Sequence, residues 1–466
     1  MILQGDVLEQ LRPMRANSVH MVVTSPPYWS LRDYGVPPSI WGGDPACEHV
    51  WQSAGSKEGY TAKKKWQHSM TNEPDSNGRG EPRAGKKRSR LRSDNPEGWN
   101  QIEQGQFCTS CGAWRGCLGL EPTPDLYVEH IATIFDEVRR VLRHDGCLFL
   151  NMGDSYMTDA PGRNSIDPKN IIGRKRGGDE RPNRGRLPGL KHKDLVGVPW
   201  MVAFALRARG WYLRSDIIWS KTNPMPESIK DRPTKSHEYI FLLAKSQRYY
   251  FDPEAIREKA LVGNHHRNVV VSVKSHVPGA PVHTGLRSTP PASAGRNRRS
   301  VWTFPTSPYK GAHFATFPPR LVEPCILAGT SSHGCCSMCG APYKRIVKLG
   351  EPLIDQMKVA GADNAGKYSG KATKAYAGTG AQDPSATKAR ILDGMRERIT
   401  VGWRRTCAHT LSTVEPCVVL DPFGGTGTTG MVAEKHGRDY ILIELSAANV
   451  ALTNERLAPS RVEVSA

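Results

Sequence analysis

Short apolar runs alternate with segments of helical periodicity along much of this chain. The runs predict buried strands at residues 19–23, 147–152, 212–219, 238–245, 417–420 and 440–443. Apolar positions spaced three and four apart predict helices at residues 126–142, 199–209, 321–328 and 431–436. Because a helix followed by an apolar strand is one α/β unit, we expect an α/β fold with a doubly wound, mostly parallel sheet. The polar link 226–238 is too short for a helical crossover and predicts an antiparallel strand at the sheet edge.

One predicted strand, residues 19–23, leads directly into Thr24-Ser25-Pro26-Pro27-Tyr28-Trp29. Paired prolines lack amide donors, so the chain must leave the sheet there. It leaves with a hydroxyl, a prolyl carbonyl and two aromatic rings at a strand's carboxyl end, where open α/β sheets bind ligands. For a bare Pro-Pro-Tyr, a turn followed by core aromatics would be the favoured interpretation.

A second strand, residues 417–420, turns into a helix through Asp421-Pro422-Phe423-Gly424-Gly425-Thr426-Gly427-Thr428-Thr429-Gly430. The spacing of Gly425, Gly427 and Gly430 fits a dinucleotide fingerprint, and Glu444 follows the next strand, where a ribose-binding carboxylate belongs. The fingerprint alone is weak, and the preceding Asp-Pro-Phe is foreign to nicotinamide-binding sequences. The glycines would let the backbone approach a nucleoside and its attached chain.

The chain has 466 residues, with 64 Lys and Arg against 45 Asp and Glu, a formal net charge of +19. That surplus favours a polyanionic partner, although basic charge is also common on solvated faces. No apolar run is long enough to span a membrane, and the first residues do not resemble a signal peptide, so we expect a cytoplasmic protein. The eleven cysteines are then reduced, and those at short spacings favour metal ligation over disulfides.

Two sets of cysteine and histidine have the spacing of zinc ligands. Cys-x-His precedes Cys-x-x-Cys-Gly in the first set, and the order is reversed in the second. Each supplies four ligands for tetrahedral zinc. The sets are Cys47, His49, Cys108 and Cys111, and Cys336, Cys339, Cys407 and His409, with Cys335 as an alternative ligand. The other cysteines, Cys117, Cys147, Cys325 and Cys417, are assigned to packing.

The segment Thr24–Trp29 together with Asp421–Gly430 resembles the S-adenosylmethionine-dependent DNA amino-methyltransferases, which methylate cytosine N4 or adenine N6. The catalytic tetrapeptide precedes the cofactor loop, as in the family's permuted β group, and the resemblance implies a Rossmann-like methyltransferase sheet. It also implies the site roles. Ser25 and the Pro26 carbonyl of Ser25-Pro26-Pro27-Tyr28 would accept hydrogen bonds from the target amine, and Tyr28 would stack on a base flipped from the duplex. The cofactor would be bound by Asp421, Phe423, Gly424, Gly425, Thr426 and Gly427, by Glu444 at the ribose and by Asp6 near the adenine.

This resemblance divides the chain into seven segments. Core segments are 1–46, 118–251 with a basic loop at 158–193, and 417–466, which carries the cofactor half. Residues 47–117 and 331–416 are insertions with zinc-type ligands that resemble phage elaborations, 252–301 is a variable DNA-facing segment, and 302–330 is a cofactor-side helix. The implied partner is double-stranded DNA, and we expect no association with a membrane. The resemblance also allows a homodimer and a cognate restriction nuclease.

Several alternatives stay open. Ser-Pro-Pro-Tyr favours cytosine N4 within the family, and adenine N6 is the alternative. RNA methylation would use the same site chemistry. Methylation at cytosine C5 needs a cysteine nucleophile, and Cys325 and Cys417 of the two Pro-Cys pairs fall inside a predicted helix and strand. A non-catalytic, zinc-containing DNA-binding protein would account for the charge and cysteines but not for the two sequence segments.

Overall fold

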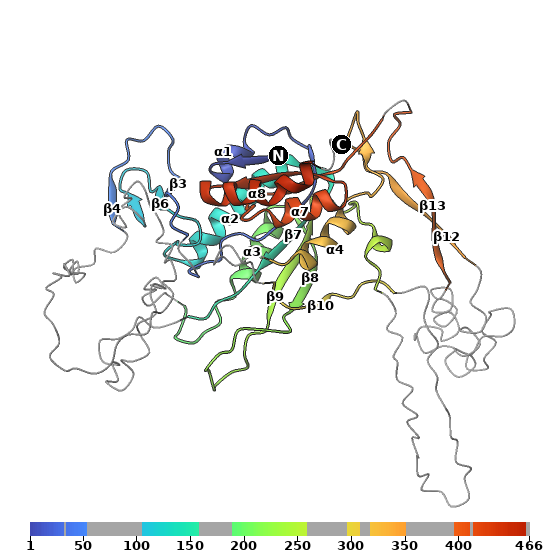
Figure 1. Ribbon diagram of the computed structural model, residues 1–466. Helices are drawn as coiled ribbons and strands as arrows, with labels where there is room; N and C mark the ends of the chain where they lie inside the picture. Colours follow the sequence, from blue (N-terminus) through green and yellow to red (C-terminus); the bar gives the residue numbers. More distant parts are fainter. Residues whose placement is uncertain are drawn as a thin grey trace, which may run out of the picture. The chain divides into compact units, whose positions relative to one another are not determined.

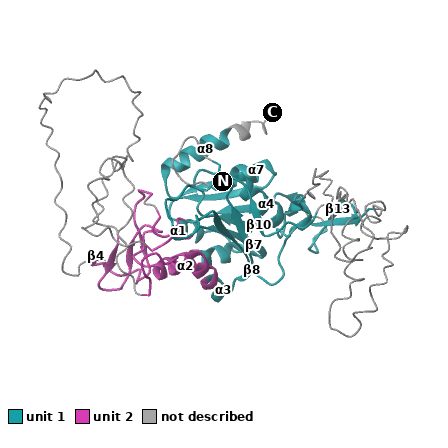
Figure 2. Cartoon of the chain, turned by 90° about the horizontal axis from the view of Figure 1, so that it is seen from below, with its two compact units in different colours: residues 1–26, 135–153, 206–466 teal, residues 27–134, 154–205 magenta. Residues whose placement is uncertain are grey.

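We describe a computed structural model for residues 1–31, 34–53, 105–157, 189–258, 296–307, 317–350, 396–410 and 413–462. The chain forms two compact units, each built from separate stretches of sequence (Figure 2). Unit 1 comprises Met1–Pro26, Phe135–Gly153 and Leu206–Ala466, and unit 2 comprises Pro27–Ile134 and Asp154–Ala205. Most of the basic segments expected to face DNA, at 158–193 and 252–301, lie outside the described residues.

Unit 1 is built on an eight-stranded sheet (Figure 1). Its order is β1 (Ile2–Gln4), β16 (Asp439–Glu444), β15 (Val418–Asp421), β2 (Val19–Thr24), β7 (Leu142–Met152), β9 (His237–Ala244), β8 (Tyr212–Ser220) and β10 (Val301–Thr303). All neighbours are parallel except β9, which is antiparallel to both β7 and β8. The mostly parallel α/β sheet with an antiparallel strand is therefore confirmed.

The antiparallel strand is not at the edge, and that part of the prediction was wrong. β9 lies between β7 and β8, and β10 pairs in parallel with the outer side of β8. β10 has three residues, of which only Trp302 is buried. Such a short strand leaves no apolar run in the sequence, so β8 and β9 looked like the end of the sheet.

Apolar sequence explains the central strands, because both faces of the sheet are covered. Every residue of β2 is buried, and so are the last seven of β7. Helix α4 (Pro319–Gly329) packs against β2, β7 and α7 (Thr428–Lys435), and α8 (Ala447–Val462) packs against β1 and β16. Met21, Phe149 and Leu321 belong to the resulting core, and α1 (Val7–Leu11) contacts β16. The strands therefore present their carboxyl ends from a rigid support.

Unit 1 also holds two small antiparallel sheets. One pairs β11 (Cys335–Cys336) with β14 (Val414–Glu415), and the other pairs β12 (Lys344–Leu349) with β13 (Arg398–Arg404). A short 3-10 helix, η3 (Pro253–Ile256), packs against α4.

Unit 2 contains an antiparallel four-stranded sheet that the apolar pattern did not predict. Its order is β3 (Ser39–Trp41), β6 (Trp114–Gly116), β5 (Gln106–Cys108) and β4 (Trp51–Ser53). Trp41 and Trp114 stack on His130 with ring centroids 4.7 and 5.3 Å away. His130 belongs to α2 (Pro124–Val141), the helix whose residues up to 134 lie in unit 2. The remaining helix, α3 (Val198–Ala208), lies at the place expected from its periodicity.

Candidate active site

The carboxyl ends of β2 and β15 are bonded together within unit 1. The two strands are parallel neighbours, and Thr24, the last residue of β2, donates its hydroxyl to Asp421 Oδ1 over 2.6 Å. Asp421 is the last residue of β15. The segments that start at Ser25 and at Pro422 therefore leave the sheet at the same edge.

Asp421 organises this edge through bonds to protein groups on both of its carboxylate oxygens. Oδ1 accepts from Thr24 and from the Phe423 amide at 3.1 Å, and Oδ2 accepts from the Thr429 hydroxyl at 2.6 Å. The side chain is 1% exposed, and burial raises its pKa from 3.8 to about 6. Asp421 was expected to bind the cofactor, and the bonds seen here tie β2, the loop after β15 and α7 to one another.

The loop after β15 requires glycine at two positions. Gly427 has φ of +76° and precedes the first turn of α7, and Gly425 has φ of +52°. A Cβ on Gly427 would also lie 2.5 Å from Thr453 Cγ2 of α8. Thr453 in turn donates to the Gly425 carbonyl at 3.0 Å, and Arg456 Nη1 donates to the Thr426 carbonyl at 2.9 Å. Thr453 and Arg456 of α8 thus fix the loop by hydrogen bonds, a role that was not predicted from the sequence.

Glu444 ends β16 beside this loop. Its Oε2 accepts from the Gly425 amide and its Oε1 from the Ser446 amide, both at 2.8 Å, and burial raises its pKa. The Asn449 side chain and the Leu445 amide also hydrogen-bond to this carboxylate and favour its charged form. The side chain is only partly buried, which leaves Glu444 accessible from outside.

Asp6 lies at the same sheet edge and also caps a helix. β1 pairs in parallel with β16, and the Gly5 amide donates to the Glu444 carbonyl at 3.0 Å. Asp6 is the N-cap of α1, with Oδ1 accepting from the Leu8 and Glu9 amides at 2.9 and 3.4 Å. Part of the hydrogen-bond accepting capacity of the Asp6 carboxylate is therefore used in capping α1.

A polar network extends from Ser25 across three strands of unit 1. Asn151 Nδ2 of β7 lies 3.4 Å from Ser25 Oγ and 2.9 Å from Glu238 Oε2 of β9. The other oxygen of Glu238 accepts from Lys221 Nζ, whose ammonium lies 4.7 Å from the centroid of Trp219. Asn151, Glu238 and Lys221 were not predicted from the sequence. Because β9 runs antiparallel, its amino end lies beside the carboxyl ends of β7 and β8, and recognising that would have brought these residues together.

Unit 2 begins at Pro27, and residues 27–29 form hydrogen bonds there with residues 121–127. Tyr127 Oη donates to the Pro27 carbonyl at 2.8 Å, and burial raises the pKa of Tyr127 well above its usual value. Trp29 Nε1 donates to the Glu121 carbonyl at 2.9 Å. Pro27 and Tyr28 are themselves partly exposed. The backbone that carries Tyr28 is thus fixed on both sides.

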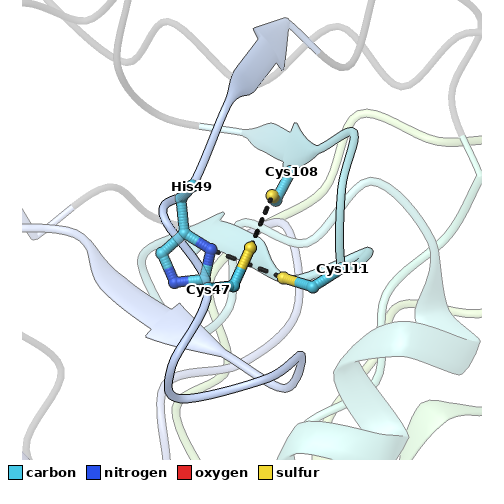
Figure 3. Close-up of side chains that lie close together, drawn as sticks. All are labelled: Cys47, His49, Cys108 and Cys111. Atoms are coloured by element: carbon cyan, nitrogen blue, oxygen red, sulfur yellow. Dashed lines mark hydrogen bonds between the residues drawn. The ribbon is translucent and has the colours of Figure 1, made fainter.

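The first expected zinc set is brought together in unit 2 (Figure 3). Its four ligand atoms all lie within 4.8 Å of one another, with Cys47 Sγ 3.9 Å from Cys108 Sγ and Cys111 Sγ 3.4 Å from His49 Nδ1. Bonds of about 2.1–2.3 Å to a tetrahedral zinc ion separate its ligands by roughly 3.4–3.8 Å. The spacing of these side chains is close to that of a zinc site.

The second expected set is brought together in unit 1. The ligand atoms of Cys336, Cys339, Cys407 and His409 lie within 4.8 Å of one another, and Cys336 Sγ is 3.7 Å from His409 Nδ1. Cys335 does not join them. Its sulfur lies instead close to Cys417 and His20, and all three residues are buried.

His20 is not available as a ligand in this third group. Its Nδ1 accepts from the Val418 amide at 2.9 Å, and its Nε2 lies 2.8 Å from the Gly340 carbonyl, to which it donates. Both ring nitrogens are therefore engaged with backbone groups. Cys325, the cysteine of the other Pro-Cys pair, is fully buried inside α4 and donates to the Leu321 carbonyl.

Comparison with known proteins assigns the family. A family model described as DNA methylase, for N6 and N4 methyltransferases, matches residues 19–336 and 410–455. The chain belongs to the N4/N6 DNA methyltransferase family. It is therefore a DNA methyltransferase, and the resemblance drawn from its two sequence segments is confirmed.

Two curated relatives are type II methyltransferases. M.Cfr9I of Citrobacter freundii is 35% identical over 71% of this chain and 72% of its own length. M.XycI of Xanthomonas campestris pv. cyanopsidis is 31% identical over 98% of this chain and 87% of its own. Among solved structures, the cytosine-N4-specific PvuII DNA methyltransferase has a TM-score of 0.42 and 14% identity, over 98% of this chain and 85% of that one. No helix in the described part of the chain has the length and apolar character needed to span a bilayer.

Proposed function

We propose that this methyltransferase transfers a methyl group from S-adenosylmethionine to N4 of a cytosine flipped out of duplex DNA. The observation that carries the proposal is the bonded edge of unit 1, where Asp421 joins the end of β2 to the glycine loop after β15. Ser25-Pro26-Pro27-Tyr28 starts at this edge, and within the family such a tetrapeptide favours cytosine N4. The formal net charge of +19 is suited to a DNA substrate.

The residues around the loop fit the methyl donor. Gly424, Gly425 and Gly427 let the backbone of the loop come close to a ligand, and Phe423 supplies an apolar surface. Glu444 would accept from the ribose hydroxyls, with Asp6 near the adenine and Thr426 and Asp421 shaping the loop. S-adenosylmethionine supplies an activated methyl group for attack by a weak nucleophile.

Ser25 is suited to positioning the amine. A hydroxyl has one donor and two acceptor positions, and Asn151 Nδ2 approaches one of the acceptors at 3.4 Å. In this proposal the Ser25 hydroxyl accepts an amine hydrogen of the base when DNA is bound. Drawing hydrogen bonds from the amine makes its lone pair less delocalised, with the Pro26 carbonyl as the second acceptor.

The remaining catalysis in this proposal is positional. Flipping is necessary because an amine within a base pair is not accessible for attack, and Tyr28 would stack on the extruded base. Since the amine is itself the nucleophile, no covalent enzyme intermediate is needed, and alignment of amine and methyl group supplies most of the rate.

We also propose that the two Cys3His sets hold structural zinc. Three thiolates and one imidazole complete a tetrahedral shell and leave no open position for a substrate. The separations of the ligand atoms support this reading. In this role the metal would fix the loops that carry the ligands and take no part in methyl transfer.

The test is to incubate the purified protein with methyl-labelled S-adenosylmethionine and duplex DNA, digest the DNA to nucleosides and identify the label by mass spectrometry. We expect N4-methylcytosine. N6-methyladenine would overturn the choice of base while keeping the site, and label only on RNA in a competition experiment would overturn the substrate. C5-methylcytosine would exclude the proposed mechanism altogether.

A further inference from the structure

Two ligands of the second zinc set, Cys336 and Cys339, lie on a loop that is hydrogen-bonded directly to the central strands of unit 1. The loop is a tight turn: the Gly340 amide donates to the Cys336 carbonyl at 2.7 Å, and the Cys336 amide donates to the Ala341 carbonyl at 3.0 Å. Gly340 has φ of +68°, a conformation that favours glycine. Two successive carbonyls of this turn, those of Cys339 and Gly340, are acceptors for buried side chains of the sheet.

The first of these side chains is Arg143, the second residue of β7. Its guanidinium donates to the Cys339 carbonyl at 2.5 Å, and it pairs in two-pronged fashion with Asp145 at 2.9 and 3.2 Å. Arg143 is only 5% exposed, so water does not replace a lost partner readily. A Cβ on Gly340 would lie 2.9 Å from Arg143 Nη1, which shows how closely the turn approaches.

The second is His20, the second residue of β2. It donates to the Gly340 carbonyl from Nε2 and accepts the amide of Val418, the first residue of β15, at Nδ1. The acceptor role of Nδ1 sets the tautomer, because a neutral imidazole carries one proton. One turn thus contacts β7 and β2 at their amino ends and is linked to β15 through His20, opposite the edge that carries Ser25 and the glycine loop.

We propose that the zinc ion held by Cys336, Cys339, Cys407 and His409 acts as a clamp that orders the amino ends of β2, β15 and β7. This inference rests on the zinc assignment made above and is independent of the target base. Three thiolates and Zn²⁺ carry a net charge of −1, and the Arg143 guanidinium beside the turn complements it. With the metal bound, the turn keeps both carbonyls aimed at the sheet. Without it, two buried donors lose fixed partners.

The first zinc set provides a matched control within the same chain. Its turn has the same form, with the Gly112 amide donating to the Cys108 carbonyl at 2.9 Å and φ of +74° at Gly112. A Cβ on Gly112, however, would meet nothing within 4 Å. The two turns share their backbone conformation and ligand chemistry, and they differ in the buried groups that they contact.

The experiment compares the full chain with its Cys339→Ser and Cys111→Ser variants. Zinc content by plasma mass spectrometry should be about two ions per chain for the parent and about one for each variant. Hydrogen exchange followed by mass spectrometry should show amides of β2 and β15 exchanging roughly tenfold faster in Cys339→Ser. In Cys111→Ser the same amides should stay within about twofold of the parent, while those of β5 and β6 exchange faster.

A second pair of variants covers the case in which Cys339→Ser does not fold. Gly340→Ala and Gly112→Ala introduce the same backbone strain, so only the former should accelerate exchange in β2 and β15. A parent without zinc would overturn the metal assignment. Loss of one zinc ion with unchanged exchange in β2 and β15, or equal effects of the two glycine variants, would overturn the clamp. Neither result depends on methylation, which is assayed separately.

Discussion

Replacing Asp421 by asparagine should change how the stability of the chain depends on pH. Asp421 is 1% exposed and its pKa is raised from 3.8 to about 6 by burial, which outweighs the hydrogen bonds from Thr24, Thr429 and the Phe423 amide. The folded state therefore holds a proton on this carboxyl between those two pH values, where the unfolded state has lost it. Stability contributed by this group is lower above pH 6 and recovers as the pH falls toward 4.

The magnitude follows from the two pKa values. Raising the pKa from 3.8 to about 6 makes the ionised carboxylate cost about 3 kcal/mol in the folded state, since a tenfold change in proton affinity is about 1.4 kcal/mol. The variant also loses the hydrogen bonds that Thr24 and Thr429 donate to the carboxylate. At any single pH, this loss opposes the gain from removing a buried charge, so one value of the unfolding free energy does not separate the two effects. The difference in unfolding free energy between the parent and the variant changes with pH only through the ionisation of Asp421. Between pH 7 and pH 4, the parent should gain about 2.4 kcal/mol relative to Asp421→Asn, because the unfolded carboxyl is itself partly protonated at pH 4.

Urea unfolding followed by tryptophan fluorescence at several pH values measures this difference. Other titrating groups, including the two cysteine and histidine sets, are common to both proteins and cancel. Asp439→Asn is the matched control, because it makes the same substitution at an exposed aspartate at the start of β16. A difference between the parent and Asp421→Asn that stays constant from pH 7 to pH 4, or that moves against the parent, would refute the buried carboxylate as described.

Two further predictions concern the cofactor loop and the network behind Ser25. Gly427→Ala should weaken S-adenosylmethionine binding by at least about tenfold in calorimetry, because φ is +76° and the new Cβ meets Thr453, whereas Gly437→Ala, with φ of +65° in open space, should not. Equal affinities for the two variants would contradict the assigned loop. Glu238→Gln should lower kcat about tenfold with little change in cofactor affinity, since Asn151 and Lys221 lose a charged partner. A fall in cofactor affinity with an unchanged kcat would place Glu238 on the cofactor side instead.

Strands and helices with long apolar patterns were predictable from sequence, and those without were not. All residues of β2 are buried and four of its six are apolar, and β7, β8, β9, β15 and β16 also contain apolar runs. β1 and β10 have three residues each, and the four strands of the unit 2 sheet are equally short. Their existence depends on pairing with distant partners, which local periodicity does not record.

The candidate site was predictable where chemistry depends on a contiguous segment. Both zinc sets and the two segments around Ser25 and Gly425 were visible because spacing in the sequence carries their signal. Asn151 and Glu238 were not visible, since their bond joins residues 87 positions apart through the antiparallel pairing of β7 and β9. The proximity of Cys417 to His20 and Cys335 was not predicted, because these neighbours are remote in sequence.

The most direct test of the account separates methyl transfer from cofactor binding. We would compare the parent with a Ser25→Ala, Tyr28→Ala double variant, measuring S-adenosylmethionine affinity by calorimetry and label transfer to duplex DNA in single turnover. We predict affinity within about twofold of the parent and a loss of transfer of at least about a thousandfold, because in the proposed site these side chains contact the base and not the cofactor. A double variant that methylates DNA at the parent's rate would contradict the assignment of the active site.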